Sequence, residues 1–169
     1  MKQIVKFQDL GIDRDYQEIW DYQESLLADN IAIKQYHRAQ EKEGKSDFKT
    51  TTNHLLFVEH PHVYTLGKSG HLENMLASSD KLNEINATFV KTNRGGDITY
   101  HGPQQLVGYP IIDLDTFKPD IHLYMRNLEE VIIKTIAEYG LKGERSNGET
   151  GVWLDPGKPY ARKICAMGG

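Results

Sequence analysis

Residues 94–110 read RGGDITYHGPQQLVGYP and hold the densest set of residues suited to chemistry in the chain. Two adjacent glycines follow a predicted strand, where they let the backbone approach a ligand and offer N–H groups to an oxygen. Arg94 beside them suits a carboxylate or phosphate, and residues 97–101 predict a short strand carrying hydroxyls and an imidazole. A glycine hairpin with a structural arginine is the competing interpretation. The spacing matches neither a Walker A loop nor a dinucleotide fingerprint.

The sequence on both sides of this stretch predicts an α+β fold. Helices are expected at residues 13–40, where Asp13 or Asp15 can cap, at 80–85 and at 120–139, and a loop is expected at 41–52. Apolar or alternating runs predict strands at 1–7, 55–59, 63–66, 88–92, 97–101 and 105–114. They also predict a hairpin from 151–154 and 161–167, joined by a turn at 155–158. The run at 105–114 suits a central strand, although Pro110 cannot donate to a ladder. Because strands and helices do not alternate regularly, we expect a mixed or antiparallel sheet with packed helices.

Length and composition place the chain among single-domain globular proteins. Its 169 residues, 38% of them hydrophobic, are enough to bury a core. The single cysteine excludes an internal disulfide and a multi-cysteine zinc cluster, and no apolar run reaches the roughly 20 residues of a membrane helix. We therefore expect one cytoplasmic domain over residues 1–169, with no membrane partner. The net charge of −4 argues against nucleic acid as a partner bound through bulk charge.

A second candidate for chemistry is the strand that contains Lys163 and Cys165. Alternation along a strand places the two side chains on one face. Partial burial would make the lysine proton labile enough for acid–base work, and a cation two residues away could activate the thiol. In the competing interpretation Cys165 is a small core residue, since Ile164, Ala166 and Met167 flank it.

Histidines and acidic residues elsewhere favour structural roles. His60 and His62 would share a strand face if Pro61 leaves the strand intact, but a metal site needs a third ligand that the spacing does not supply. Glu129 and Glu130 are expected on the solvated face of the second long helix. The acidic residues Asp113, Asp115 and Asp120 suit loops and helix caps.

Three segments together resemble a known family. They are residues 59–67 (EHPHVYTLG), residues 94–110, and residues 151–153 (GVW) followed by 163–168 (KICAMG). Their order and spacing resemble the lipoyl(octanoyl) transferases, or octanoyl-[acyl-carrier-protein]:protein N-octanoyltransferases. The resemblance implies a fold like the catalytic domain of biotin and lipoate protein ligases, and it implies no metal and no cofactor.

The resemblance also implies a reaction, partners and site residues. Octanoyl would pass from octanoyl-acyl carrier protein, through an enzyme thioester, to a lysine of a lipoyl domain in 2-oxoacid dehydrogenase complexes or of the glycine cleavage H protein. By position, Lys163 matches the catalytic lysine that lowers the pKa of the nucleophile and shuttles the proton. The residues that match the acyl-binding positions are Arg94, Gly95, Gly96, Asp97, Ile98, Thr99, Tyr100, His101, Ala166, Met167 and Gly168.

One departure from the family pattern concerns the nucleophile. The family's cysteine follows a later His-Gly pair, whereas Cys165 stands where members carry a small residue. We therefore expect the N-terminal and central part of a transferase fold, with pocket and lysine but without the nucleophile, and inactive as given. Two alternatives are an ATP-dependent lipoate or biotin ligase, against which residues 100–103 (YHGP) argue, and a non-enzymatic remnant that binds acyl chains or acyl carrier protein.

Overall fold

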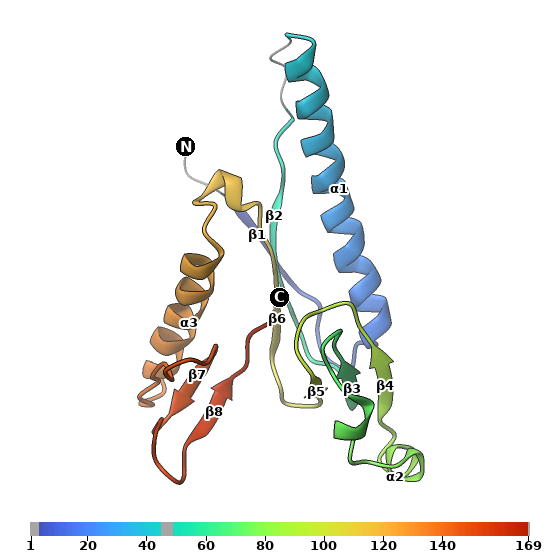
Figure 1. The fold of residues 1–169 in the computed structure, drawn as a ribbon, viewed down its shortest axis with the longest axis vertical. Helices are drawn as coiled ribbons and strands as arrows, with labels where there is room; N and C mark the ends of the chain where they lie inside the picture. The colour runs from blue at the N-terminus through green and yellow to red at the C-terminus, as the bar shows by residue number, and fades with distance from the viewer. Residues whose placement is uncertain (1–3, 45–48, 169) are drawn as a thin grey trace. The chain divides into compact units, whose positions relative to one another are not determined.

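The computed structural model describes residues 4–44 and 49–168. The chain divides between Phe117 and Lys118 into two compact units, which are described in turn. Both units combine helices with short sheets of mixed or antiparallel pairing (Figure 1). The prediction of an α+β fold with mixed sheets is therefore confirmed. Among the described residues, no helix combines the length and apolar character needed to cross a membrane.

Helix α1 (Tyr16–Lys42) begins where the sequence predicts a helix. Asp15 is its N-cap, with a carboxylate that accepts a hydrogen bond from Glu18 N at 2.9 Å. The helix continues two residues into the predicted loop, of which residues 45–48 lie outside the described residues. Along α1 the buried residues are Ile19 and Asn30, so the helix covers the core through a narrower stripe than its spacing predicts.

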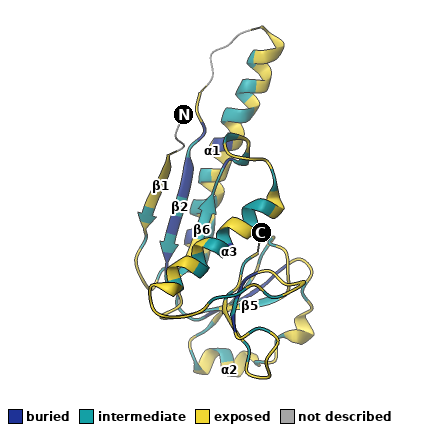
Figure 2. Ribbon diagram, turned by 90° about the vertical axis from the view of Figure 1, so that its left-hand side faces the viewer, coloured by how far each residue is buried: buried dark blue, intermediate teal, exposed yellow. Residues whose placement is uncertain are grey.

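The first sheet of the N-terminal unit has the strand order β1 (Val5–Asp9), β2 (Asn53–Val58) and β6 (Val107–Ile111). Strand β1 is parallel to β2, and β6 is antiparallel to it. Figure 2 shows β2 as the buried strand between more exposed neighbours. The prediction that β6 is central is wrong for the described part of the chain, where β6 pairs with β2 alone. An edge position suits Pro110, which has no N–H to donate.

The second sheet of this unit has the order β4 (Thr88–Lys91), β3 (Val63–Leu66) and β5 (Ile98–His101). Strand β3 is parallel to β4 and antiparallel to β5. A short 3₁₀ helix (Leu72–Asn74) and helix α2 (Ser79–Glu84) connect β3 to β4. The apolar run around Pro61 is thus two strands in two different sheets, and residues 59–62 connect them.

Asp113 joins helix α1 to the end of β6. Its carboxylate caps the 3₁₀ helix Leu114–Thr116, as the sequence predicts for a loop-and-cap residue. It also accepts hydrogen bonds from Lys34 Nζ at 2.6 Å and Thr51 Oγ1 at 2.8 Å. Burial opposes its ionisation, but the bonds from Lys34 and Thr51 outweigh burial and lower the pKa of Asp113.

The C-terminal unit consists of helix α3 (Ile121–Ala137) and the antiparallel strands β7 (Val152–Leu154) and β8 (Arg162–Cys165). Asp120 caps α3 by accepting a hydrogen bond from Leu123 N at 2.9 Å. The predicted hairpin is confirmed, but β8 ends at Cys165. Trp153 lies opposite Lys163 and Val152 opposite Cys165, so Ile164 is an extra residue that forms a bulge.

Candidate functional site

Arg94 holds the loop between β4 and β5 against the sheet. Its guanidinium donates hydrogen bonds to the carbonyl oxygens of Gly95, Thr65 and Asp97 at 2.8, 3.0 and 2.9 Å, and to Thr65 Oγ1 at 2.7 Å. Thr65 lies on β3 and has no exposed surface, so these bonds tie the loop to the core. Because the guanidinium is directed at protein carbonyl oxygens, Arg94 has the structural role given by the competing interpretation of the sequence.

Two glycines let this loop lie directly on the end of β3. A Cβ atom on Gly67 would come within 2.3 Å of the Gly96 carbonyl oxygen, so only glycine allows this approach. Gly96 has a φ of +81°, which favours glycine. Gly95 and Gly96 are exposed, and their N–H groups make no hydrogen bond to another described residue. Both N–H groups are therefore available to an oxygen of a ligand.

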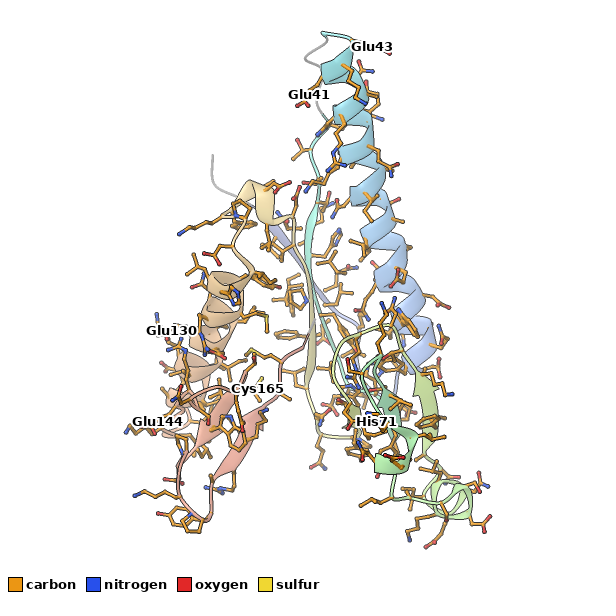
Figure 3. All side chains as sticks on the ribbon, viewed as in Figure 1. Glu41, Glu43, His71, Glu130, Glu144 and Cys165 are labelled. Carbon is orange, nitrogen blue, oxygen red and sulfur yellow. The ribbon has the colours of Figure 1, made fainter. Side chains whose placement is uncertain are left out.

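The carboxylate of Asp97 is occupied by the turn that follows β3. It accepts hydrogen bonds from His71 N at 3.2 Å and from the side-chain amide of Asn74 (His71 is labelled in Figure 3). Its carbonyl oxygen accepts a further bond from Gly67 N at 3.2 Å. Asp97 thus fixes the loop, and its side chain points to protein groups.

Strand β5 presents two different faces. Tyr100 packs against Tyr64 with ring centroids 5.1 Å apart, and its hydroxyl lies 2.6 Å from His62 Nδ1. A Cβ atom on Gly102 would overlap the Tyr100 hydroxyl at 2.1 Å, so the glycine leaves room for this ring. Residues alternate along a strand, and His101 accordingly joins a different set of rings.

His101 belongs to a cluster of four rings that the sequence did not bring together. Tyr16 from α1 is stacked on His101 with centroids 5.9 Å apart and an interplanar angle of 16°. His60 lies 5.9 Å from His101 and 5.2 Å from Tyr16, and Tyr109 from β6 is 5.9 Å from His60. The four residues are up to 93 positions apart in the chain, so the local spacing of residues could not predict that their rings meet.

Both ring nitrogens of His60 are bonded to protein atoms. Nδ1 lies 2.8 Å from the Arg14 carbonyl oxygen, and Nε2 lies 3.0 Å from the Tyr109 hydroxyl. Since a carbonyl only accepts, Nδ1 donates and Nε2 accepts from Tyr109. His60 is 1% exposed and joins α1, β6 and the segment between β2 and β3. The described residues contain no group of three metal-ligating side chains, and the shared strand face considered for His60 and His62 does not form.

Burial sets the protonation state of the ring cluster. It lowers the pKa of His60 and of His101, despite the hydrogen bonds that these rings make to Arg14 and Gln105. It raises the pKa of Tyr16 and Tyr109. All four rings are therefore uncharged at neutral pH.

Lys163 and Cys165 lie in the C-terminal unit, and residues 94–101 lie in the N-terminal one. The partial burial considered for Lys163 is wrong: its side chain is exposed, with the ammonium over the Trp153 ring at 5.0 Å from the centroid. Cys165, labelled on β8 in Figure 3, is half-buried. Burial raises the pKa of its thiol, and the lowering effect of Lys163 is smaller. Beyond the strand, Ala166 and Gly168 are exposed and Met167 is half-buried.

Gly151 brings the Lys163 side chain close to the backbone. A Cβ atom on Gly151 would lie 3.0 Å from Lys163 Cε and 2.4 Å from the Cys165 carbonyl oxygen. Gly151 also has a φ of +117°, and its N–H donates to Glu129 Oε1 at 3.0 Å. The position therefore needs glycine for both its conformation and its neighbours.

The expectation that Glu129 lies on a solvated helix face is wrong. Glu129 is 1% exposed, and its other oxygen accepts bonds from Arg126 at 2.7 Å and Arg145 at 2.9 Å. Burial opposes ionisation, but the bonds from Gly151, Arg126 and Arg145 outweigh it and lower the pKa of Glu129. The side chain of Glu130 is partly exposed and also binds Arg145.

The family model for the lipoyl protein ligase A/B catalytic domain matches residues 15–169, and the chain belongs to this family. Within it, the chain is 60% identical over 168 residues to the octanoyltransferase of Christiangramia forsetii and 57% identical to that of Flavobacterium psychrophilum. Each alignment covers 99% of this chain and 69% or 70% of the relative. The resemblance to octanoyltransferases is thereby confirmed.

Solved structures agree on the fold. A bipartite lipoate protein ligase from Thermoplasma acidophilum matches 99% of this chain and 58% of its own, with a TM-score of 0.58 and 17% identity. A lipoate-protein ligase A bound with ATP matches 92% of this chain and 55% of its own, with a TM-score of 0.51 and 14% identity. The predicted likeness to the ligase catalytic domain is confirmed at the level of the fold.

Proposed function

We propose that this chain supplies the acyl-binding loop and the catalytic lysine of an octanoyltransferase, which moves an octanoyl group from a carrier thioester to a lysine of a lipoyl-domain protein. The identity of 60% over 99% of the chain to a relative named octanoyltransferase carries the proposal. The chemistry needs donors for the thioester oxygen, an apolar slot and a group that moves a proton. The N–H groups of Gly95 and Gly96 are proposed as the donors to the thioester oxygen. The amine of Lys163 is proposed as the group that moves the proton.

The acyl-binding residues are proposed in two groups. Arg94 to His101 offer backbone donors at the two glycines and the neutral imidazole of His101, and the hydrogen bonds of Arg94 and Asp97 hold this loop in shape. Ala166, Met167 and Gly168 follow β8 and present small or apolar groups suited to a hydrocarbon chain. Lys163 is the proposed catalytic residue. Cys165 is proposed as a packing residue, because burial raises the pKa of its thiol.

The proposed partners follow from the reaction. The donor is octanoyl-acyl carrier protein, and the acceptor is a lipoyl domain of a 2-oxoacid dehydrogenase complex or the glycine cleavage H protein. The archaeal ligase of the same fold was solved as part of a lipoylation system with its E2 lipoyl domain. The cytoplasm is the proposed location.

A second candidate is an ATP-dependent ligase, since a ligase of the same fold binds ATP. One experiment separates the candidates: the full-length protein that carries these residues is incubated with an unmodified lipoyl domain, and mass spectrometry follows octanoylation of the lysine. Octanoyl-acyl carrier protein without ATP should give the product. Product from free octanoate and ATP alone would indicate the ligase, and acyl binding without product would indicate the non-enzymatic alternative.

Gly96→Val is expected to abolish octanoyl transfer while the protein stays folded. A β-branched side chain at φ +81° forces the loop to shift, and its Cβ would meet the Arg94 guanidinium at 3.3 Å. Such strain costs about 1–3 kcal/mol of stability, which a thermal melt measures beside the transfer rate. Gly44→Val is the matched control, because Gly44 has a φ of +70° with open space around it. If Gly96→Val and Gly44→Val lost the same stability and the same activity, Gly96 would be only a turn residue.

A further inference from the structure

Trp153 lies between two other backbone segments of the C-terminal unit. On one side of β7 it is opposite Lys163 of β8 (Figure 1). On the other side Trp153 N donates to the Glu144 carbonyl oxygen at 2.8 Å, and Trp153 O accepts from Glu144 N at 2.9 Å. Since both backbone groups of Trp153 are bonded to Glu144, its pair with Lys163 is of the non-hydrogen-bonded kind, in which side chains approach more closely. The indole ring is therefore held beside the side chain of Lys163.

The ammonium of Lys163 has the ring of Trp153 as its neighbour. Nζ lies 5.0 Å from the ring centroid, within the roughly 6 Å over which an aromatic face attracts a cation. No carboxylate in the described part of the chain forms an ion pair with Lys163, and that of the nearby Glu144 is paired with Lys142. The ring thus occupies the place that a counter-charge takes at other lysines.

A ring and a carboxylate have different effects on a lysine that shuttles a proton. A carboxylate favours the charged form and keeps the proton on the amine. An aromatic face attracts an exposed ammonium by a factor of only about two to five, and it does not exchange protons itself. The indole N–H of Trp153 is buried without a hydrogen-bond partner among the described residues. The ring therefore acts on Lys163 through its face alone.

The stem of Lys163 is confined as well as its ammonium. Its Cε would lie 3.0 Å from a Cβ atom on Gly151, and Gly151 N is bonded to the buried carboxylate of Glu129 at 3.0 Å. A fixed backbone thus lies against the stem while the ring lies at the tip. A free lysine side chain has many rotamers, and holding the reacting amine in one place contributes to catalysis.

We propose that Trp153 is a positioning residue, which holds the amine of Lys163 in place for proton transfer. The proposal rests on the proposed function, in which Lys163 moves the proton. It gives Trp153 no chemical step of its own. What the site requires at this position is an aromatic face, and neither the indole N–H nor apolar volume alone replaces it.

The contact is measured by NMR of the full-length protein with ¹³C-methylated lysine amines, a modification that keeps the positive charge. The Lys163 signal, identified by its loss in Lys163→Arg, should lie upfield of that of the exposed Lys158, because a ring shields methyl groups over its face. The non-aromatic variants Trp153→Leu and Trp153→Met should remove this displacement, and Trp153→Phe should keep part of it. Trp20→Leu removes the other tryptophan, on α1, and should change nothing.

The transfer rate of the same variants gives the second measurement, with a thermal melt to show that each is folded. Trp153→Leu and Trp153→Met should lower kcat roughly two- to five-fold at unchanged KM. Trp153→Phe should restore most of the rate, and Trp20→Leu should have no effect.

Three results would overturn the proposal. They are a Lys163 signal without displacement in the wild type, a displacement that is lost while kcat stays unchanged, and equal losses of kcat in the aromatic and non-aromatic variants. A wild type that shows the displacement but transfers no octanoyl group would overturn the proposed function and with it this role, and the NMR signal would still report the contact.

Discussion

Replacing Lys163 by alanine is expected to reduce octanoyl transfer by roughly a hundred- to ten-thousand-fold, the usual effect of removing a positioned acid–base group. Cys165→Ala is expected to leave transfer close to that of the wild type. The contrast follows from the environments of the two side chains. The Lys163 amine is exposed over Trp153, whereas the Cys165 thiol is half-buried with a raised pKa, and the thiolate is the nucleophilic form.

A third variant separates the two ways in which Lys163 could act. Lys163→Arg keeps a cation that packs on Trp153 but cannot release a proton near neutral pH. If Lys163 shuttles a proton, Lys163→Arg should be nearly as impaired as Lys163→Ala. Lys158→Ala, in the turn of the same hairpin, is the control for loss of an exposed charge. A hydroxylamine-sensitive octanoyl adduct on Cys165, found by mass spectrometry of this chain after incubation with octanoyl-acyl carrier protein, would refute the assignment.

The features that the sequence predicts correctly are those that depend on neighbouring residues. Asp15 and Asp120 cap the two long helices through bonds to residues three positions ahead. The β7–β8 hairpin follows from the turn at residues 155–158, where Asp155 O accepts from Lys158 N at 3.2 Å. These caps and this turn depend on residues a few positions apart in the chain, so periodicity and cap chemistry are enough to predict them.

The features that the sequence missed depend on distant partners. Strand β6 lies at the edge of its sheet in the described residues, although its own residues are apolar enough for a central strand. His60 is hydrogen-bonded to Tyr109, which lies 49 positions further along the chain. A histidine or glutamate has the same local pattern whether it is solvated or buried with a partner, so only the fold decides between these environments.

Glu129 shows this most clearly, and its replacement is expected to have the largest effect on stability. Glu129→Gln should destabilise the C-terminal unit by about 3 kcal/mol, because the buried carboxylate is lost and two guanidinium groups lose their counter-charge. The adjacent Glu130→Gln is the matched control. Glu130 is 44% exposed and also binds Arg145, so its loss should cost less than about 1 kcal/mol. Denaturant unfolding in a Trp20→Phe background, which leaves Trp153 as the reporter, measures both.

The same pair of variants gives a pH dependence of known sign. The folded-state pKa of Glu129 lies below the ordinary value of 4.5, so its contribution to stability is complete above that pH and is lost as the pH falls through the lower folded value. The difference in unfolding free energy between the wild type and Glu129→Gln should therefore be full at pH 7 and shrink steadily below about pH 4. Glu130→Gln should show a small difference throughout. If Glu129→Gln lost no more stability than Glu130→Gln, or kept its full deficit in acid, the buried carboxylate would not be what joins α3 to Gly151 and the hairpin that carries Lys163.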